Sequence, residues 1–190
     1  MIEVALQFLT AELNAYLAAK SGSSPAGVVK MGRVVDDTGK YALPLDSVGT
    51  TVINIEEDRI LRSQLPDYVT VAGQHIVLEP ELKLNLYILF CANFKRYDAG
   101  LKYLSLMLTF FQSHPVFTST QHPSLDRGIS KLTAELQSPS FEQLSQIWGF
   151  IGGNQLPSVL YKIRLITLQD SSQKAMQPPV GVVNRQYTGK

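Results

Sequence analysis

The sequence predicts an α/β or α+β protein, in which a central mixed β-sheet is flanked by two long helices and a short helix and is followed by a flexible C-terminal tail. Segments with helical periodicity alternate along the chain with segments rich in β-branched residues. One of the latter, 82–94, is apolar on both faces, as expected of a strand in the middle of a covered sheet. After residue 170 the composition becomes polar. We therefore expect a folded domain over 1–170 and a C-terminal arm or tail over 171–190.

Composition favours a globular protein and restricts the class of partner. The chain has 190 residues, of which 45% are hydrophobic and 17% charged. Its 17 Lys and Arg nearly balance its 16 Asp and Glu, so no strong field attracts nucleic acid or an anionic membrane. No apolar stretch reaches the roughly 18 residues needed to cross a bilayer. The sequence predicts a cytoplasmic location, no nucleic-acid partner and no direct membrane span.

The first half of the chain predicts one helix and several strands. A helix is expected over 2–19, where apolar residues recur at steps of three and four; they are Ile2, Leu6, Leu9, Leu13, Tyr16 and Leu17. The β-branched segments 28–35 and 51–57 read as strands, and 36–49 between them is too long for a tight hairpin. We expect 36–49 to be an irregular loop that could reach a neighbouring molecule, and 64–78 to form an edge strand or ribbon.

The segment from 82 to 115 predicts the central strand and the second long helix. Leu82, Leu84 and Leu86 begin one face of the strand, and Leu89 and Cys91 belong to the other. Asp98 is expected to cap the following helix, which His114-Pro115 ends. The predicted buried stripe of this helix is Leu101, Leu104, Leu108 and Phe111, broadened by Met107 and Phe110.

The remaining part predicts a strand, a short helix and a last strand. The alternation in 130–136 predicts a half-covered strand with Leu132, Ala134 and Leu136 inward. Ser140 with Gln143 forms a capping-box pattern at the start of a short helix over 140–150. In 158–168 the apolar residues alternate with Lys162 and Arg164, which face either solvent or a subunit partner.

The glycines of WGFIGGN (148–154) do not predict a phosphate site. A phosphate-binding loop follows a strand and opens a helix, whose free N–H groups then face the ligand. Here a helix comes first, the glycines follow, and Pro157 leads into a strand. We expect Gly149, Gly152 and Gly153 to form a C-cap and a turn, with Trp148 as a core or interface anchor.

No pattern in the sequence indicates catalysis, a metal or a cofactor. The single cysteine, Cys91, lies in an apolar run and predicts a buried inert thiol. His75, His114 and His122 are widely separated and lack the spacing of metal ligands. We therefore expect no cofactor and no enzymatic activity.

Function is instead expected to depend on surfaces that contact other proteins. Two segments qualify, the loop 36–49 and the apolar island VGVV in the tail, which could add a strand to a neighbour. Each could equally be plain surface or an inactive tail. The candidate interface residues are Tyr41, Leu43, Leu45, Trp148, Lys162, Arg164, Val180, Val182, Val183 and Tyr187.

Several separated blocks together resemble one protein family. The blocks are INIEEDR (53–59), NLYILFCANF (85–94), YDAGLKYLSLMLTFFQSHPVF (97–117) and LTAELQSPSFEQLSQIWGFIGGNQLPSVLYKIRLITL (132–168). In this order they are similar to the cap, or tail terminator, proteins of phage-tail-like contractile injection systems, of the antifeeding-prophage and virulence-cassette type. The similarity spans most of residues 1–170.

The resemblance implies a structural protein that closes the end of an inner tube and contractile sheath, as a homohexameric ring whose partners are the tube and sheath proteins. It implies no catalytic residues, and it places the protein in an assembled contractile particle. A ring needs self-complementary surfaces rather than a charged cleft, which agrees with the composition. The alternatives are an adaptor that recruits another protein through a sheet edge or the tail, and a small hydrolase or nucleotide-binding protein with unusual motif spacing.

Overall fold

The computed structural model describes residues 1–21, 27–58, 67–71, 74–78, 82–126, 128–168 and 175–177. Within these residues the chain forms three helices, α1 (Ile2–Ser21), α2 (Tyr97–Ser113) and α3 (Phe141–Ile151). The strands are β1 (Val29–Met31), β2 (Ser47–Glu57), β3 (Asp67–Val71), β4 (Gln74–Leu78), β5 (Leu82–Asn93), β6 (Val116–Thr118), β7 (Lys131–Gln137), β8 (Ser158–Leu168) and β9 (Ala175–Gln177). The predicted fold class, a mixed sheet with two long helices and a short one, is confirmed.

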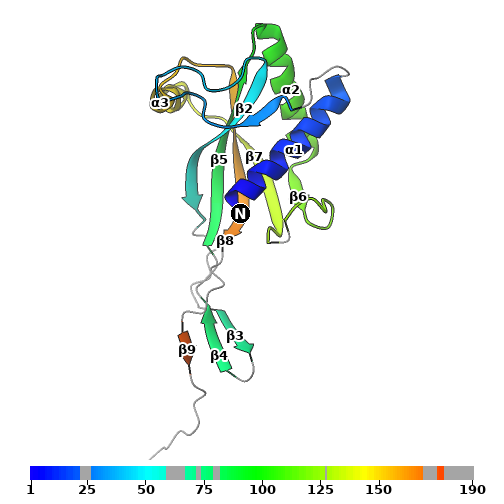
Figure 1. Ribbon diagram of the computed structural model, residues 1–190, viewed down its shortest axis with the longest axis vertical. Coiled ribbons are helices and arrows are strands. Elements are labelled where there is room, and N and C mark those ends of the chain that lie inside the picture. Colours follow the sequence, from blue (N-terminus) through cyan, green and yellow to red (C-terminus); the bar gives the residue numbers. More distant parts are fainter. Residues whose placement is uncertain are drawn as a thin grey trace, which may run out of the picture.

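Six strands form the main sheet in the order β1-β2-β5-β8-β7-β6. β1 pairs with β2 in parallel, and every other neighbouring pair in this sheet is antiparallel. β5 lies between β2 and β8 and is buried on both faces, as its two-sided apolar sequence predicts. Figure 1 shows that the sheet is strongly twisted.

α1 and α2 cover one face of the main sheet and enclose the larger core. Leu6, Leu9, Leu13 and Leu17 of α1 are buried there, which confirms the predicted stripe. They meet α2, the buried side chains of β5 and β8, and Phe117 of β6. Figure 1 shows α1 and α2 lying over this side of the strands.

The buried stripe of α2 differs from the prediction. Leu104, Met107, Phe110 and Phe111 are buried, whereas Leu101 is 42% exposed and Leu108 is only partly buried. The apolar arc of this helix is wider than its buried side, so periodicity alone does not fix which apolar residues are covered; the exposed polar side carries Lys102, Ser105, Thr109 and Gln112. Aromatic contacts, such as those of Phe110 with Tyr16 and of Phe111 with Tyr161, determine which residues of α2 are buried.

Two local predictions are wrong, and one strand was not predicted. Asp98 does not cap α2, because Arg96 is the N-cap and the helix begins two residues earlier than predicted; Asp98 forms an ion pair with Arg96 instead. Leu136 is exposed rather than inward, because it lies near the end of β7 beyond the cover of the helices. The short strand β6 is not anticipated, since three residues carry too little pattern to identify a strand.

α3 and the segment 32–46 cover part of the opposite face. Val34, Val35, Leu43 and Trp148 are buried there against Leu89 and Cys91 of β5. This second, smaller core explains why β5 must be apolar on both sides. α3 and this segment therefore sit on the face away from α1 and α2, and they leave the rest of that face open.

The second sheet, β3-β4-β9, changes the interpretation of the C-terminal region. β3 and β4 are antiparallel neighbours, and β9 pairs with β4 through His75↔Gln177, Ile76↔Met176 and Val77↔Ala175. The order β3-β4-β9 repeats the order of β2, β5 and β8, to which these strands are connected along the chain. The last strand of the chain is therefore not 158–168, and 175–177 forms a strand instead of an unstructured tail. Figure 1 shows this sheet beyond the ends of β5 and β8.

Candidate interaction surface

α3 is fixed at both ends by local sequence signals. Ser140 Oγ accepts a hydrogen bond from Gln143 N at 3.2 Å, and Gln143 Oε1 accepts one from Ser140 N at 2.9 Å, so the predicted capping box forms. Gly152 ends the helix with a φ of 78°, the left-handed conformation that glycine adopts without strain. This confirms the predicted C-cap and turn for Gly152 and Gly153, whereas the prediction is wrong for Gly149, which lies within α3.

The side of α3 that faces the sheet carries Leu144, Ile147, Trp148 and Ile151, spaced as one helical stripe. Two phenylalanines remain outside this packing. Phe150 is 91% exposed and Phe141 is 93% exposed, the highest values among the large apolar side chains of the described residues. We therefore treat the exposed side of α3 as a candidate contact surface. Phe150 could have been identified from the sequence, because it is an apolar residue off the stripe.

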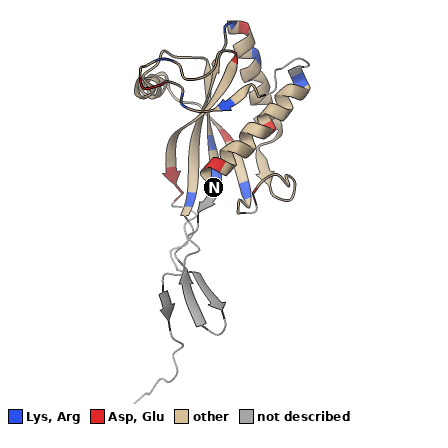
Figure 2. Ribbon diagram, viewed as in Figure 1, with Lys and Arg blue, Asp and Glu red and all other residues tan. Residues whose placement is uncertain are grey.

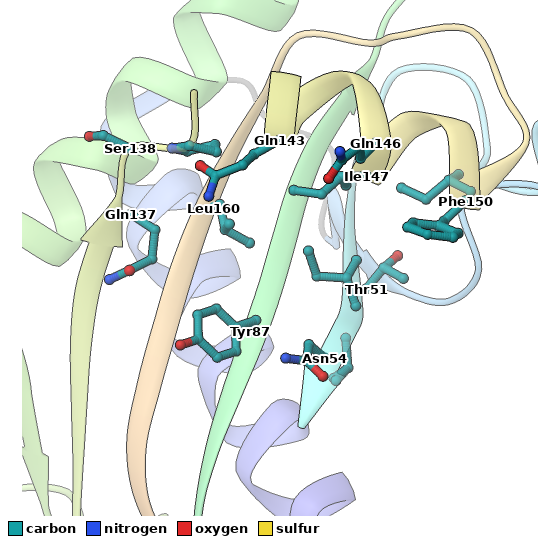
Figure 3. A pocket seen from close by; sticks show the side chains of 14 residues that line it. Thr51, Asn54, Tyr87, Gln137, Ser138, Gln143, Gln146, Ile147, Phe150 and Leu160 are labelled. Atoms are coloured by element: carbon teal, nitrogen blue, oxygen red, sulfur yellow. The ribbon is translucent and has the colours of Figure 1, made fainter. Parts of the chain in front are cut away.

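A groove of about 660 Å³ runs between α3 and the open face of the main sheet. Thr51, Ile53, Tyr87 and Leu160 contribute to its floor, and α3 supplies a wall that includes Gln146 and Phe150 (Figure 3). None of the 14 residues that line it is charged. Apolar side chains and neutral amide or hydroxyl groups alternate around it, so the groove is suited to an uncharged ligand or peptide.

On the open face of the main sheet, the predicted interface residues Lys162 and Arg164 form ion pairs within the chain. Lys162 Nζ lies 3.0 Å from Glu56 Oε2, which also accepts a hydrogen bond from the Tyr87 hydroxyl at 2.8 Å. The Tyr87 hydroxyl, and then Lys162, lower the pKa of the Glu56 carboxyl below its usual value. Arg164 pairs with Glu135 at 2.9 Å. The structure therefore places Lys162 and Arg164 on this face with their charges balanced within the chain.

The predicted loop residues separate into one buried and two accessible side chains. Leu43 is 5% exposed and belongs to the smaller core, whereas Leu45 is 58% exposed. Tyr41 is partly exposed, and its hydroxyl donates to Asn154 O at 2.8 Å. Trp148, 4% exposed, is also in the smaller core, so neither Leu43 nor Trp148 presents its side chain on the surface of this chain.

Leu45 is presented by a turn with defined anchors. Asp46 adopts a φ of 59°, unusual for a residue other than glycine, and its carboxylate accepts a hydrogen bond from Lys95 N at 3.1 Å. The Asn93 amide donates to Leu43 O at 2.9 Å. These bonds place the turn beside the start of α2, where Tyr97 and Leu101 are also exposed. Val180, Val182, Val183 and Tyr187 lie outside the described residues.

The cysteine and two histidines in the described part of the chain pack against apolar or aromatic side chains. Burial raises the pKa of the Cys91 thiol to about 12, which keeps it protonated and unreactive at neutral pH. The ring of His114 stacks on that of Phe110, with ring centroids 5.1 Å apart, and the ring centroids of His122 and Phe117 are 5.3 Å apart. The described residues contain no group of three or more His, Cys, Asp or Glu placed to hold a metal ion.

The charge and hydropathy of the described part of the chain also bear on its surface. Charged residues of both signs are scattered over the described elements, without a large region of one sign (Figure 2). None of the helices in the described ranges has the length and apolar content that a bilayer span requires. The exposed apolar groups around α3 and Leu45 are therefore the features that stand out for protein contacts.

Comparison with known proteins identifies the fold and the family. No curated protein sequence matches the chain. The fold is similar to the cryo-EM structure of the sheath/tube terminator of an extracellular contractile injection system, PVC, in the extended state, with a TM-score of 0.64 and 18% identity. It is also similar to the anti-feeding prophage cap, a tube-terminating cap, with a TM-score of 0.61 and 14% identity.

These likenesses extend over nearly all of this chain but not over all of the known structures. They cover 100% and 96% of this chain, and 64% and 61% of the respective solved chains. The chain therefore spans less than two thirds of the length of either structure. The family model described as the Pvc16 N-terminal domain matches residues 5–181, which confirms the resemblance of the separated sequence blocks. The chain belongs to the Pvc16 N-terminal domain family.

Proposed function

We propose that this protein is a structural cap that ends the inner tube and the contractile sheath of a phage-tail-like injection system. The observation that carries the proposal is the likeness of the whole chain, at a TM-score of 0.64, to a sheath/tube terminator. The likeness to a tube-terminating cap supports the same function. In this proposal the protein acts by binding other proteins and has no enzymatic activity.

The cap acts as a homohexameric ring. A closed ring requires two different surfaces on each copy that fit each other, because each subunit contacts a neighbour on either side. The exposed residues around α3 and those around Leu45 and Tyr97 supply two separate apolar surfaces in one chain. The scattered charges leave no strong repulsion between identical copies.

The partners of the ring are the tube and sheath proteins, and its location is the assembled particle, built in the cytoplasm. A stack of rings ends in a surface whose polar backbone groups and apolar side chains have no partner, and a terminator stops growth by covering that surface. The tail, 171–190, acts as an arm in this contact. Its strand β9 already adds to β4 within the chain, which shows that this segment can pair with a sheet edge.

The ring is tested by measuring the mass of the purified protein and by electron microscopy of mixtures with purified tube. We expect six-fold rings, bound to tube ends. Leu45→Asp should weaken ring formation without changing the melting temperature, because Leu45 is exposed and packs in neither core. Lys102→Asp, an exposed charge reversal on α2, is the matched control. A defined complex with one other protein and no ring would support the adaptor alternative.

The arm is tested by truncation. Removing residues after Asp170 should leave the main sheet folded, because its six strands and both cores lie before that residue. The same truncation should weaken attachment to tube and sheath. Truncation after Gln177 is the control that keeps β9. Loss of a cooperative melting transition in the shorter chain would show that the arm belongs to the folded core.

A further inference from the structure

The groove beside α3 is suited to an extended, uncharged peptide segment. Its apolar side chains can hold aliphatic groups, while the amides of Asn54 and Gln146 can pair with the N–H and C=O groups of a peptide backbone. Neither amide makes a hydrogen bond within the described part of the chain. Phe150 stands at the wall with its ring exposed, where a bound segment would cover it (Figure 3).

The chain itself contains a segment with this chemistry. Residues 175–184 carry no charge between Lys174 and Arg185, and 180–183 read VGVV. Three valines favour an extended backbone, and the preceding Pro178-Pro179 disfavours a helix. The segment therefore matches the groove in charge, in apolar content and in expected backbone conformation.

The direction of β9 leads this segment away from the groove of its own chain. Gln177 lies opposite His75 in the β4–β9 pair, and β4 runs from there toward β5 and Tyr87 in the groove floor. β9 is antiparallel to β4, so it ends at Gln177 on the side of the small sheet away from Leu78, the end of β4 that leads toward β5. Figure 1 shows the small sheet beyond the start of β5. Val182 is five residues after Gln177 and reaches at most about 18 Å from it.

We propose that residues 178–184 of one copy lie in the α3 groove of a second copy. This inference rests on the proposed ring, in which each chain has an identical neighbour, and it names the site that receives the tail. β9 ends at Gln177, on the side of the small sheet away from the main sheet, so the segment that follows begins at a point directed away from its own core.

Matched variants test whether the tail binds to the groove itself or to another part of α3. Phe150→Ala should weaken tail binding by about tenfold or more, because a buried aromatic side chain at the centre of a contact contributes strongly. Phe141→Ala is the control, since Phe141 is equally exposed on α3 but does not line the groove. Gln146→Glu, which places a charge in the groove without changing size, should also weaken binding. The measurement is fluorescence anisotropy of a labelled peptide of residues 178–190 added to each full-length variant.

Disulfide trapping tests whether the contact forms between copies. The only native cysteine, Cys91, is fully buried, so introduced cysteines react without interference. Full-length Gln146→Cys and Val182→Cys proteins are mixed under mild oxidation. We expect a linked pair that contains one copy of each variant, and no such pair when Ser105→Cys on the exposed side of α2 replaces Gln146→Cys.

The outcomes distinguish this inference from the proposed function. Rings that form normally while the cysteines do not link and the peptide does not bind would overturn the inference alone. Monomers at all concentrations that nevertheless bind the peptide, with loss on Phe150→Ala, would overturn the ring and leave the tail contact standing. Equal effects of Phe150→Ala and Phe141→Ala would also overturn the groove as the site.

Discussion

Replacing Gly49 with alanine should destabilise the protein through one contact with the loop that presents Leu45. A Cβ at position 49 would lie 2.3 Å from Leu43 Cδ1 and 2.7 Å from Leu43 Cδ2. Carbon atoms in contact are normally about 3.5–4.0 Å apart, so Leu43 would have to move by more than about 1 Å. Leu43 cannot move freely, because it is buried in the smaller core beside Trp148.

The size of the effect follows from two opposing contributions. Overpacking a core costs about 1–3 kcal/mol, while replacing glycine by alanine stabilises by about 0.4–1 kcal/mol through the unfolded chain. We expect a net loss of about 1–2 kcal/mol, which lowers the melting temperature by roughly 2–8 °C for a chain of this size. Trp148, the single tryptophan, lies in the same core and reports the transition by its fluorescence.

A double-mutant cycle decides whether this contact is the cause. Leu43→Ala alone should cost about 2–5 kcal/mol, and adding Gly49→Ala to it should cost little more, because the vacated space accepts the new methyl group. Gly32→Ala is the control, since a Cβ there meets nothing within 4 Å. The reasoning is refuted if Gly49→Ala behaves like Gly32→Ala, or if the effects of the Leu43 and Gly49 changes simply add.

Three further predictions concern α3, the open sheet face and the core thiol. Ser140→Ala should cost about 1 kcal/mol of unfolding free energy by removing the helix cap, whereas the exposed Ser145→Ala should be nearly neutral in the same denaturation assay. Because the folded-state pKa of Glu56 is lowered, its stabilising effect is present above its ordinary pKa of 4.5 and is lost as the pH falls through the lower folded value; Glu56→Gln should flatten the stability profile in that acidic range. Cys91 should not react with a thiol reagent at neutral pH until denaturant is added, and its raised pKa predicts loss of stability as the pH rises above 9.0.

Sequence patterns predicted the elements where one physical requirement dominates. The two-sided strand β5, the stripe of α1 and the capping box of Ser140 and Gln143 are each determined by residues close in the sequence. The stripe of α2 was wrong only for Leu101 and Leu108, because the apolar arc of that helix is wider than its buried side and contacts with α1 and β8 decide which apolar residues are covered. The strand β9 was missed because three residues pair only when β4 is beside them.

The sequence predicted the chemical character of the candidate surface, but two of the residues assigned to that surface are buried. Leu43 and Trp148 are apolar residues near a loop or helix end, and sequence alone does not tell whether such residues face outward or into a second core. The exposed Leu45 shows the difference, since it is two residues from Leu43 and on the other side of the same turn. Tyr41 and Arg164 are accessible and Lys162 is mostly covered, with 14% of its side chain exposed, and each of the three already has a partner within the chain.

The open half of the sheet face connects the two cores to the proposed assembly. α3 covers only the part of that face nearest Leu89 and Cys91, and the remaining part carries paired charges and an uncharged groove. A fully covered face would give a more stable isolated chain, because burying apolar surface is favourable. The chain instead leaves Phe150 exposed at an uncharged groove, which is expected if part of the stability comes from neighbouring copies in the proposed ring.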